Sequence, residues 1–166
     1  EKTRAAVVAT AKGVSAAQLN YKTAPERWSI AECLEHIASA EDFLMDLVKN
    51  QAMKGGPRAA GEDVAAIDAF VLQAIPDRSQ KVQAREPLKP SNRFGNPGDS
   101  LKHFNESRAK TVAFLKSTPD LRDHAIDSPL GKKLDAYEWV LFIGAHSERH
   151  TKQMQEVKDA PGFPKK

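Results

Sequence analysis

Hydrophobic residues recur at the spacing of an α-helix in four stretches of the chain, and no stretch shows the sustained alternation that is typical of strands. The first stretch runs from roughly Thr3 to Tyr21. It ends before Pro25, because proline disfavours helical geometry in the residue that precedes it. The pattern predicts an all-α protein.

The second stretch has a distinct start. Ser29-Ile30-Ala31-Glu32 has the form of a capping box, in which the serine side chain accepts a hydrogen bond from the glutamate amide and the glutamate side chain reaches back. The stretch continues to about Met53, where Lys54-Gly55-Gly56-Pro57 ends it. This signal predicts where the second helix begins.

The third and fourth stretches also begin at recognisable signals. The third follows Pro97-Gly98-Asp99 and runs to about Ser117. The fourth starts at Asp135, with Glu138 three positions further on, and continues to about Val157. Four helices of this length are typical of a helical bundle.

Residues 54–98 form a long connection between the second and third helices. The connection contains a short helix, Glu62 to Ile75, followed by a proline-rich segment. Such a length lets the third helix run parallel to the second, and long ordered connections are often functional. We expect one domain, residues 1–166, folded as a four-helix bundle with this connection near a site.

Three histidines are expected to face between the helices. A helix turns by about 100° per residue, so the directions of its side chains can be compared. On the fourth helix, His146 and His150 fall within about 20–30° of the centre of the apolar stripe. On the second helix, His36 lies at the margin of the apolar arc, beside Ala40 and Phe43, where solvent could reach it.

These histidines predict a divalent-metal site. A single inward histidine is more often a hydrogen-bonded core residue, and that interpretation stays open. Two rings at i and i+4 favour a metal, because an unpartnered buried polar group costs about 1–3 kcal/mol and one ion satisfies both rings. Three neutral imidazoles on His36, His146 and His150 leave coordination positions free for water or substrate. Imidazole suits zinc, nickel, copper or iron, so the ligands do not name the metal.

Two further residues are candidates for catalysis. Arg108 projects from the apolar stripe of the third helix. It either forms an anion clamp, or packs its stem while its head extends to solvent or pairs with a carboxylate. Glu32 lies one turn before His36, where it orients that ring, serves as a base or keeps its capping role. His103 is expected to be solvated, and His124 has no partner that the sequence can place.

Composition narrows the classes of partner. The net charge is +3, no basic run is interleaved with aromatic residues, and no apolar run approaches the roughly 18 residues of a membrane span. We therefore expect neither nucleic acid nor membrane as a partner. The lone Cys33 excludes an internal disulfide and a cysteine-rich zinc site. The sequence begins at Glu1 and not at a methionine. We expect a cytoplasmic location by default, and an extracytoplasmic location if a leader peptide has been removed.

Two segments together resemble the DinB/YfiT-like superfamily of metal-binding four-helix bundles. Residues 25–37, PERWSIAECLEHI, are similar to the family's tryptophan-serine start and helix-borne histidine. Residues 145–154, AHSERHTKQM, are similar to its closing H-x-x-x-H helix. The likeness extends over nearly the whole chain. It implies an up-down-down-up bundle with His36, His146 and His150 on a divalent metal, often zinc or nickel.

The proteins that this sequence resembles have several activities. Some are thiol-dependent S-transferases that use bacillithiol, mycothiol or glutathione, one branch isomerises maleylpyruvate, others were labelled metal-dependent hydrolases, and homodimers are common. The resemblance implies a metal-dependent enzyme, similar to a thiol S-transferase or a hydrolase, acting on a small-molecule substrate. A low-molecular-weight thiol is a candidate cosubstrate. The alternative is a non-catalytic metal-binding or stress-associated module in which the metal is structural.

Overall fold

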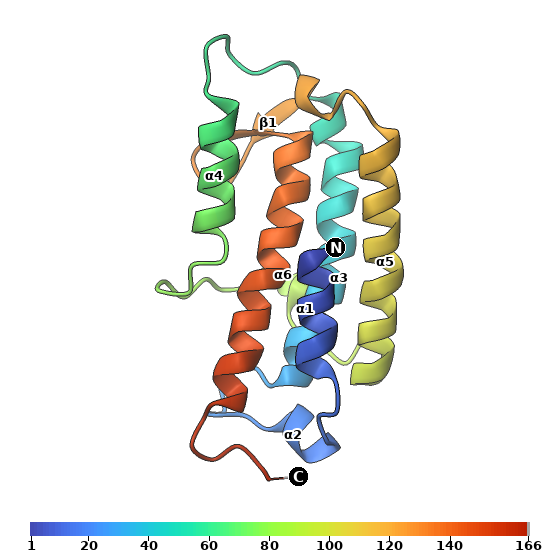
Figure 1. The fold of residues 1–166 in the computed structure, drawn as a ribbon, viewed down its shortest axis with the longest axis vertical. Coiled ribbons are helices and arrows are strands. Elements are labelled where there is room, and N and C mark those ends of the chain that lie inside the picture. The colour runs from blue at the N-terminus through green and yellow to red at the C-terminus, as the bar shows by residue number, and fades with distance from the viewer. Residues whose placement is uncertain (166) are drawn as a thin grey trace.

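The computed structural model describes residues 1–165 and shows a bundle of helices with a small β-hairpin at one end (Figure 1). The helices and strands are α1 (Lys2–Ala11), α2 (Ala16–Asn20), α3 (Ile30–Asn50), α4 (Val64–Ala74), α5 (Pro97–Ser117), β1 (Ala125–Asp127), β2 (Lys133–Asp135) and α6 (Ala136–Lys158). Single 3-10 turns lie at η1 (Ala52–Lys54), η2 (Glu86–Leu88) and η3 (Leu121–Asp123). Within residues 1–165, no helix has the length and apolar character needed to cross a membrane.

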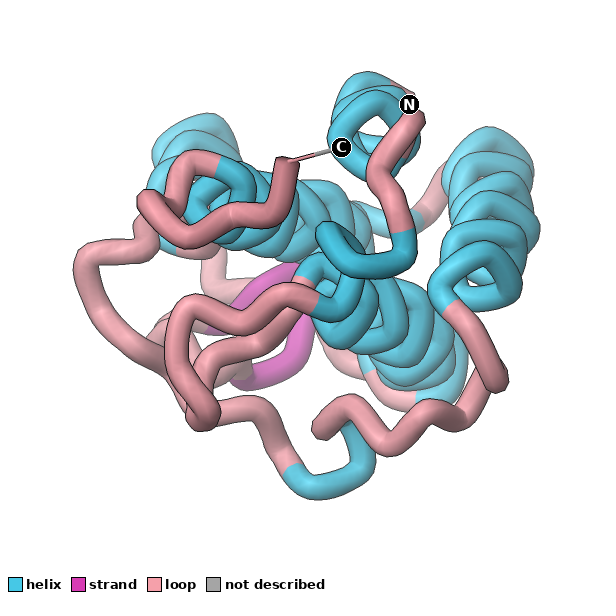
Figure 2. Tube along the Cα trace, turned by 90° about the horizontal axis from the view of Figure 1, so that it is seen from below, coloured by secondary structure: helices cyan, strands magenta, loops and turns pink. Residues whose placement is uncertain are grey.

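The bundle consists of α1, α3, α5 and α6. Helices α3 and α5 run in one direction, and α1 and α6 run in the other (Figure 1). Helix α1 packs against α5 and α6, which both also pack against α3, while α4 lies outside on α6. Seen from below, the connection between α4 and α5 lies on the side opposite α1 (Figure 2). The predicted four-helix bundle, its up-down-down-up order and the parallel second and third helices are confirmed.

Capping boxes fix the starts of the two histidine-bearing helices. At α3, the Glu32 amide donates to Ser29 Oγ at 3.2 Å, and the Ser29 amide donates to the Glu32 carboxylate at 2.8 Å. At α6, Asp135 and Glu138 make the same pair of bonds, at 2.7 and 2.8 Å. Both predicted helix starts are therefore confirmed. The predicted directions of the side chains on α3 and α6 were counted along these two helices.

The predicted first helix, Thr3 to Tyr21, is wrong because the chain breaks it in two. Gly13 adopts a φ of 69°, the left-handed conformation that commonly ends a helix and that glycine adopts without steric penalty. Ser15 then caps the short helix α2 through Gln18. The apolar spacing continued across the glycine, and this continuity concealed the break.

Three other helix ends differ from their predicted positions by more than one residue. Helix α5 begins at Pro97 and not after Asp99, because the Asn96 side chain caps it by accepting from the Asp99 amide. Helix α3 ends at Asn50, and the chain as far as Lys54 forms a 3-10 turn. The short helix starts at Val64, two residues later than predicted, because the Asp63 side chain caps it by accepting from Ala66 N–H. These shifts are of the size expected when boundaries are read from propensity alone.

The β-hairpin was not predicted. Strands β1 and β2 pair antiparallel, with Ala125 opposite Asp135. Three residues per strand are too few for an alternating pattern to be visible in a sequence. The hairpin leads directly into α6, and Gly55 packs against it so closely that a Cβ there would lie 2.4 Å from the Ala125 carbonyl oxygen.

The core is divided along the bundle axis into two hydrophobic clusters. The cluster at the hairpin end includes Met45, Val48, Leu134, Trp139 and Ile143, and the other includes Val7, Ile30, Leu34, Phe104 and Met154. Between them lie polar side chains from α3, α5 and α6. We call this set the polar layer: His36, Glu41, Arg108, Thr111, His146, Ser147 and His150.

Arg108 connects all four bundle helices within the polar layer. Its guanidinium donates to both Glu41 carboxylate oxygens at 2.7 Å, and both side chains are almost completely buried. It also donates to Ser147 Oγ at 2.8 Å and to Thr3 Oγ1 at 2.9 Å. Thr111 donates to the same Glu41 carboxylate at 2.7 Å, so the ion pair is fully hydrogen-bonded.

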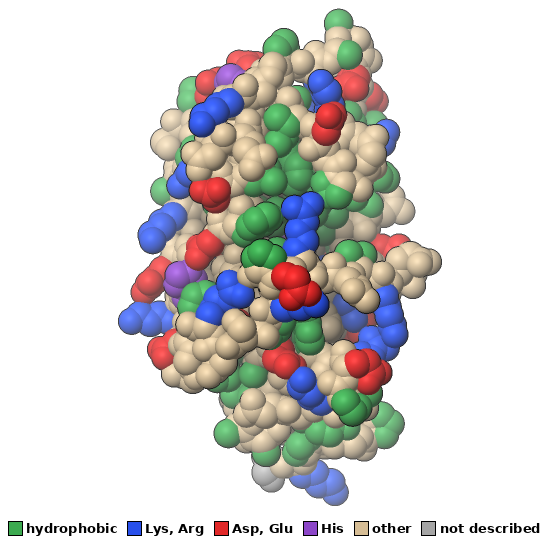
Figure 3. Space-filling model, turned by 180° about the vertical axis from the view of Figure 1, so that it is seen from behind, with side chains coloured by type: hydrophobic (Ala, Val, Ile, Leu, Met, Phe, Trp, Pro, Cys, Tyr) green, Lys and Arg blue, Asp and Glu red, His purple; other side chains and the backbone are tan. Residues whose placement is uncertain are grey.

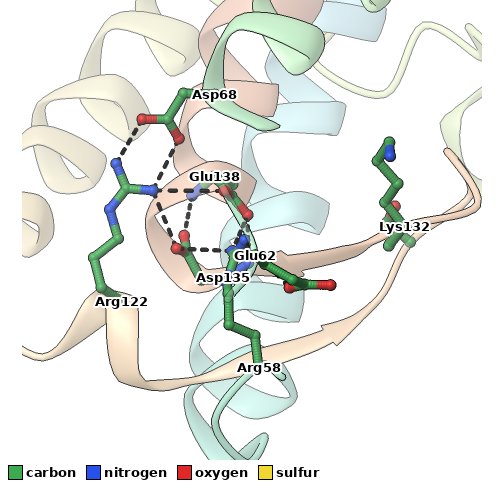
Figure 4. Close-up of polar contacts among 8 residues, drawn as sticks. Arg58, Glu62, Asp68, Arg122, Lys132, Asp135 and Glu138 are labelled. Atoms are coloured by element: carbon green, nitrogen blue, oxygen red, sulfur yellow. Dashed lines mark hydrogen bonds and ion pairs between the residues drawn. The ribbon is translucent and has the colours of Figure 1, made fainter. Parts of the chain in front are cut away.

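A second ion-pair network closes the hairpin end (Figure 4). Arg122 pairs with Asp68 of α4 at 2.7 Å and with Asp135 at 3.1 Å. Arg58 pairs with Asp135 at 3.0 Å and with Glu138, and both acidic side chains are fully buried. Burial raises the pKa of Glu138, while its bond to Arg58 opposes that shift. The network fastens α4 and the chain before it to the first turn of α6.

Candidate metal site

The three predicted histidines converge in the polar layer. The Nε2 atom of His146 lies 3.2 Å from Nε2 of His36 and 3.2 Å from Nε2 of His150. One ligand atom from each ring falls within 4.8 Å of the others, so the group can hold a metal ion. Within residues 1–165, no fourth histidine, cysteine or carboxylate joins it.

Hydrogen bonds at the far side of two rings fix which nitrogen carries the proton. His36 Nδ1 lies 2.8 Å from the Leu88 carbonyl oxygen, which only accepts, so Nδ1 must donate. His150 Nδ1 lies 2.9 Å from Gln153 Oε1. That amide oxygen also accepts from Arg78 at 3.3 Å, and arginine only donates, so the amide orientation is set. Both neutral rings therefore direct an Nε2 lone pair at His146.

Burial keeps the rings neutral. It lowers the pKa of His146 to about 3, and the neighbouring His36 adds to this effect. Burial also lowers the pKa of His150 well below its usual range, with His146 as the next cause. The pKa of His36 is lowered by burial too, although the bond to the Leu88 carbonyl opposes the shift. Neutral imidazole is the form that coordinates a metal.

The donor set fits a divalent ion. Two imidazole nitrogens bound to one zinc at 2.0–2.1 Å lie about 3.3 Å apart when the angle is near tetrahedral. The observed separations of 3.2 Å match that spacing. The Nε2 atoms of His36 and His150 are unprotonated, so at most the Nε2 of His146 carries a proton. The lone pairs that point inward repel one another, and a cation relieves this repulsion.

The α4–α5 connection is fastened beside His36. The Glu35 carboxylate accepts from the backbone amides of Ser91, Asn92 and Arg93 at 2.7, 2.9 and 3.1 Å. These amide bonds lower the pKa of Glu35 in spite of burial, which acts in the opposite sense. Glu35, which is adjacent to His36, thus anchors the segment whose Leu88 carbonyl orients the His36 ring.

Helix α6 fastens the other end of the same connection. The Arg149 guanidinium donates to the backbone carbonyls of Ile75, Asp77 and Gln80. Arg78 pairs with Glu156 through both carboxylate oxygens while it holds the Gln153 amide. The connection is therefore a fixed wall of the site, held by residues next to His36 and His150.

An aromatic ring and one of two cavities lie beside the site. The Trp28 ring lies 4.7 Å from the His36 ring and 6.0 Å from the His150 ring, centroid to centroid. A cavity of about 180 Å³ adjoins this wall and is lined in part by Arg27, Trp28 and Gln153. A larger cavity of about 480 Å³ lies at the hairpin end, contains no histidine in its lining and is separate from the site.

By accessible surface, His146 is the most exposed of the three residues, although its ring lies among enough protein atoms for burial to lower its pKa. His36 is only 3% exposed and His150 7%, whereas His146 remains partly exposed. His36 was expected at a solvent-accessible margin, and that expectation is wrong because the connection covers it. On the face opposite α1, hydrophobic side chains gather in a hollow above the connection (Figure 3).

The two candidate catalytic residues are engaged elsewhere. Glu32 accepts from the Ser29 amide and from Lys22 Nζ at 2.7 Å, and the group that orients His36 is the Leu88 carbonyl. Arg108 is bonded to Glu41, which matches the alternative of a carboxylate pair. For Arg108 to bind a ligand anion, its ion pair with Glu41 would have to break.

The remaining histidines lie away from the three-histidine group. The His103 side chain is 37% exposed, contacts Asp42 at 2.5 Å and stacks on Phe94, so it is only partly solvated. His124 lies 3.1 Å from the Gly55 carbonyl oxygen and 3.3 Å from Asp120, at the hairpin end. Neither contacts the metal site.

Replacing Gln153 should weaken metal binding. Loss of the group that orients a ligand typically lowers metal affinity about 10-fold to 100-fold, so we expect that loss for Gln153→Leu. Gln153→Glu keeps the acceptor and should retain the affinity. The exposed Gln155 on the same helix supplies the control, Gln155→Leu. Competition with a chromophoric chelator at pH 7.5 measures the affinity, and equal values for the two leucine variants would contradict the role of Gln153.

The chain is similar to known proteins in sequence and in fold. The chain is 28% identical over 149 residues to the uncharacterized protein YuaE of Bacillus subtilis strain 168, covering 89% of this chain and 88% of YuaE. The structure of YfiT from Bacillus subtilis, described as a probable metal-dependent hydrolase with an unusual four-helix bundle topology, matches with a TM-score of 0.63. That match covers 98% of this chain and 83% of YfiT at 14% identity, which shows a shared fold. The sequence profile of the DinB superfamily matches residues 1–154, and this chain belongs to that superfamily.

Proposed function

We propose that this protein is a divalent-metal enzyme, with zinc or nickel as the ion, that activates a small nucleophile for attack on a small-molecule substrate. The observation that carries the proposal is the open donor set: three neutral histidines converge, and no fourth protein ligand joins them within residues 1–165. A structural zinc is normally closed by four protein ligands. The donor set therefore favours catalysis over the non-catalytic module.

The protein's own residues supply position and protection. His36, His146 and His150 would hold the ion, while Leu88 and Gln153 fix two of their rings. Such an ion supplies Lewis-acid chemistry, which makes a water or a thiol a stronger nucleophile near neutral pH. The Trp28 ring shields the two buried ligands.

Two nucleophiles have separate support. The description of YfiT as a probable metal-dependent hydrolase favours water. The absence of a carboxylate from the histidine group in residues 1–165 favours a thiol, because a thiol ionises far more readily than water and depends less on a nearby base. Hydrolysis is our first proposal, and transfer of a low-molecular-weight thiol is the second.

A paired screen tests the proposal. Zinc-loaded and nickel-loaded protein would be assayed for hydrolysis of nitrophenyl esters and for conjugation of bacillithiol, mycothiol or glutathione to chlorodinitrobenzene. We expect turnover in one assay that is lost in His150→Ala and kept in Gln155→Leu. Metal-loaded protein that turns over no compound in either assay would support the non-catalytic module instead.

A further inference from the structure

The positive charge of the chain is concentrated in the connection that walls the site. The whole sequence has 25 lysines and arginines and 22 acidic residues. Residues 75–96, between the end of α4 and the start of α5, contain five of those basic residues and two of the acidic ones. The rest of the chain is left with 20 of each, so the net charge of +3 belongs to this segment.

Two cations of the connection have no ion-pair partner in residues 1–165. Arg78 pairs with Glu156, Lys89 with Glu86 and Arg93 with Glu35. Lys81 and Arg85 are exposed and make no such pair with any described residue. Their charges are available to a ligand.

Arg85 lies close to the site along the chain. The amide of Leu88 donates to the Arg85 carbonyl at 2.9 Å, which closes one 3-10 turn between them. At about 2 Å of rise per residue, the two Cα atoms lie about 6 Å apart along that turn. Leu88 itself contacts His36 at 2.8 Å. Arg85 therefore lies in the same turn as the carbonyl that orients His36. Lys81 directly follows Gln80, whose carbonyl accepts from Arg149, the neighbour of His150.

The donor set leaves a bound ion's charge uncompensated. Three neutral imidazoles bring no negative charge, and the carboxylates nearest in sequence are already bonded: Glu35 to the connection and Glu41 to Arg108. A cleft that carries one sign of charge raises the local concentration of the opposite sign. The electrostatics around the site therefore favour an anion.

We propose that the metal centre takes a small anionic substrate, one that carries a carboxylate or phosphate group, and that Arg85 and Lys81 recognise this group. The inference rests on the proposed function and names the substrate class for it. Guanidinium binds either oxyanion through two parallel hydrogen bonds. Hydrophobic side chains beside the connection suit an apolar body on the same molecule (Figure 3).

Binding to zinc-loaded protein tests the inference without an activity assay. Benzoate, phenylphosphonate and benzamide share a phenyl ring and differ in the charged group, and amide shifts in NMR spectra report each dissociation constant. We expect benzoate or phenylphosphonate to bind at least about tenfold more tightly than benzamide. The comparison of the two anions separates carboxylate from phosphate recognition.

Charge-matched variants locate the interaction. Lys81→Gln with Arg85→Gln should weaken binding of the preferred anion about tenfold, whereas Lys110→Gln with Lys116→Gln on the exposed face of α5 should change it less than about twofold. Benzamide that binds as tightly as the anions, or equal losses in the two double variants, would overturn the inference alone. A larger loss in Arg27→Gln would also overturn it, because the anion would then lie in the 180 Å³ cavity. If the protein takes up no zinc, the proposed function is contradicted as well.

Discussion

Adding zinc or nickel to metal-free protein at pH 7.5 is expected to raise its melting temperature, and His146→Ala or His150→Ala is expected to abolish the increase. A ligand that binds only the folded state stabilises it by about 2.7 kcal/mol at a hundredfold excess over Kd. For a chain of this size, that corresponds to a shift of about 5–10 °C. Each alanine variant removes one of three converging nitrogens. Thermal unfolding followed by circular dichroism measures the shift.

His103→Ala is the control, because His103 lies outside the three-histidine group. The rise in melting temperature that metal causes in His103→Ala should equal the rise in the wild type. If the wild type and His150→Ala respond identically to added metal, the converging rings are hydrogen-bonded core residues. That was the alternative left open for an inward histidine.

The pH dependence follows from the lowered histidine pKa values. In the unfolded chain these rings take up protons near pH 6.5, whereas the folded protein resists until lower pH, with His146 at about 3. The unfolded state then binds more protons, so stability without metal declines as pH falls below about 6.5. The rise in melting temperature that added metal causes should persist at pH 6 and disappear toward pH 3. An increment already halved at pH 6.5 would show that the folded rings are not held neutral.

Arg108→Met is expected to lower the free energy of unfolding by about 3–5 kcal/mol, the usual result of removing one member of a buried ion pair. The change leaves the Glu41 carboxyl group 1% exposed and without its bidentate partner. Urea unfolding of the metal-free protein measures the loss. A change below about 1 kcal/mol would mean that water reaches Glu41.

The double variant Glu41→Leu with Arg108→Met separates stability from function. Replacing a buried ion pair by apolar residues of similar volume is often neutral or stabilising, so most of the lost stability should return. Zinc uptake should also be retained, because neither residue belongs to the histidine group. A double variant that is stable but takes up no zinc would show that Arg108 supports the site itself.

The histidine group could be anticipated because helical periodicity determines it. Once capping boxes fix the starts of α3 and α6, the directions of His36, His146 and His150 follow from 100° per residue. For Arg108, a pair with a carboxylate was one of the alternatives that the sequence left open. The identity of that carboxylate, Glu41 on another helix, depends on how α3 and α5 lie against each other.

The parts of the site that escaped prediction come from segments without periodicity. Leu88 contributes a backbone carbonyl, which no side-chain pattern records. Gln153 lies on α6, but its role depends on Arg78, 75 residues away in the chain. The burial of His36 likewise depends on where the connection crosses. Each of these contacts is set by tertiary packing and not by local sequence.

The polar layer has a consequence for the axial register of the helices. A hydrophobic cluster specifies helix register less strictly than a buried ion pair does, because volume-conserving exchanges of apolar side chains usually cost less than about 1.5 kcal/mol. Arg108 does not tolerate sliding, because a slip of one turn, about 5.4 Å, would leave Arg108 and Glu41 unpaired in the interior. The same arginine holds Ser147, the neighbour of His146, so α3 and α6 are aligned through α5. The approach of His36 on α3 to His146 on α6 therefore rests on a register that this buried ion pair helps to set.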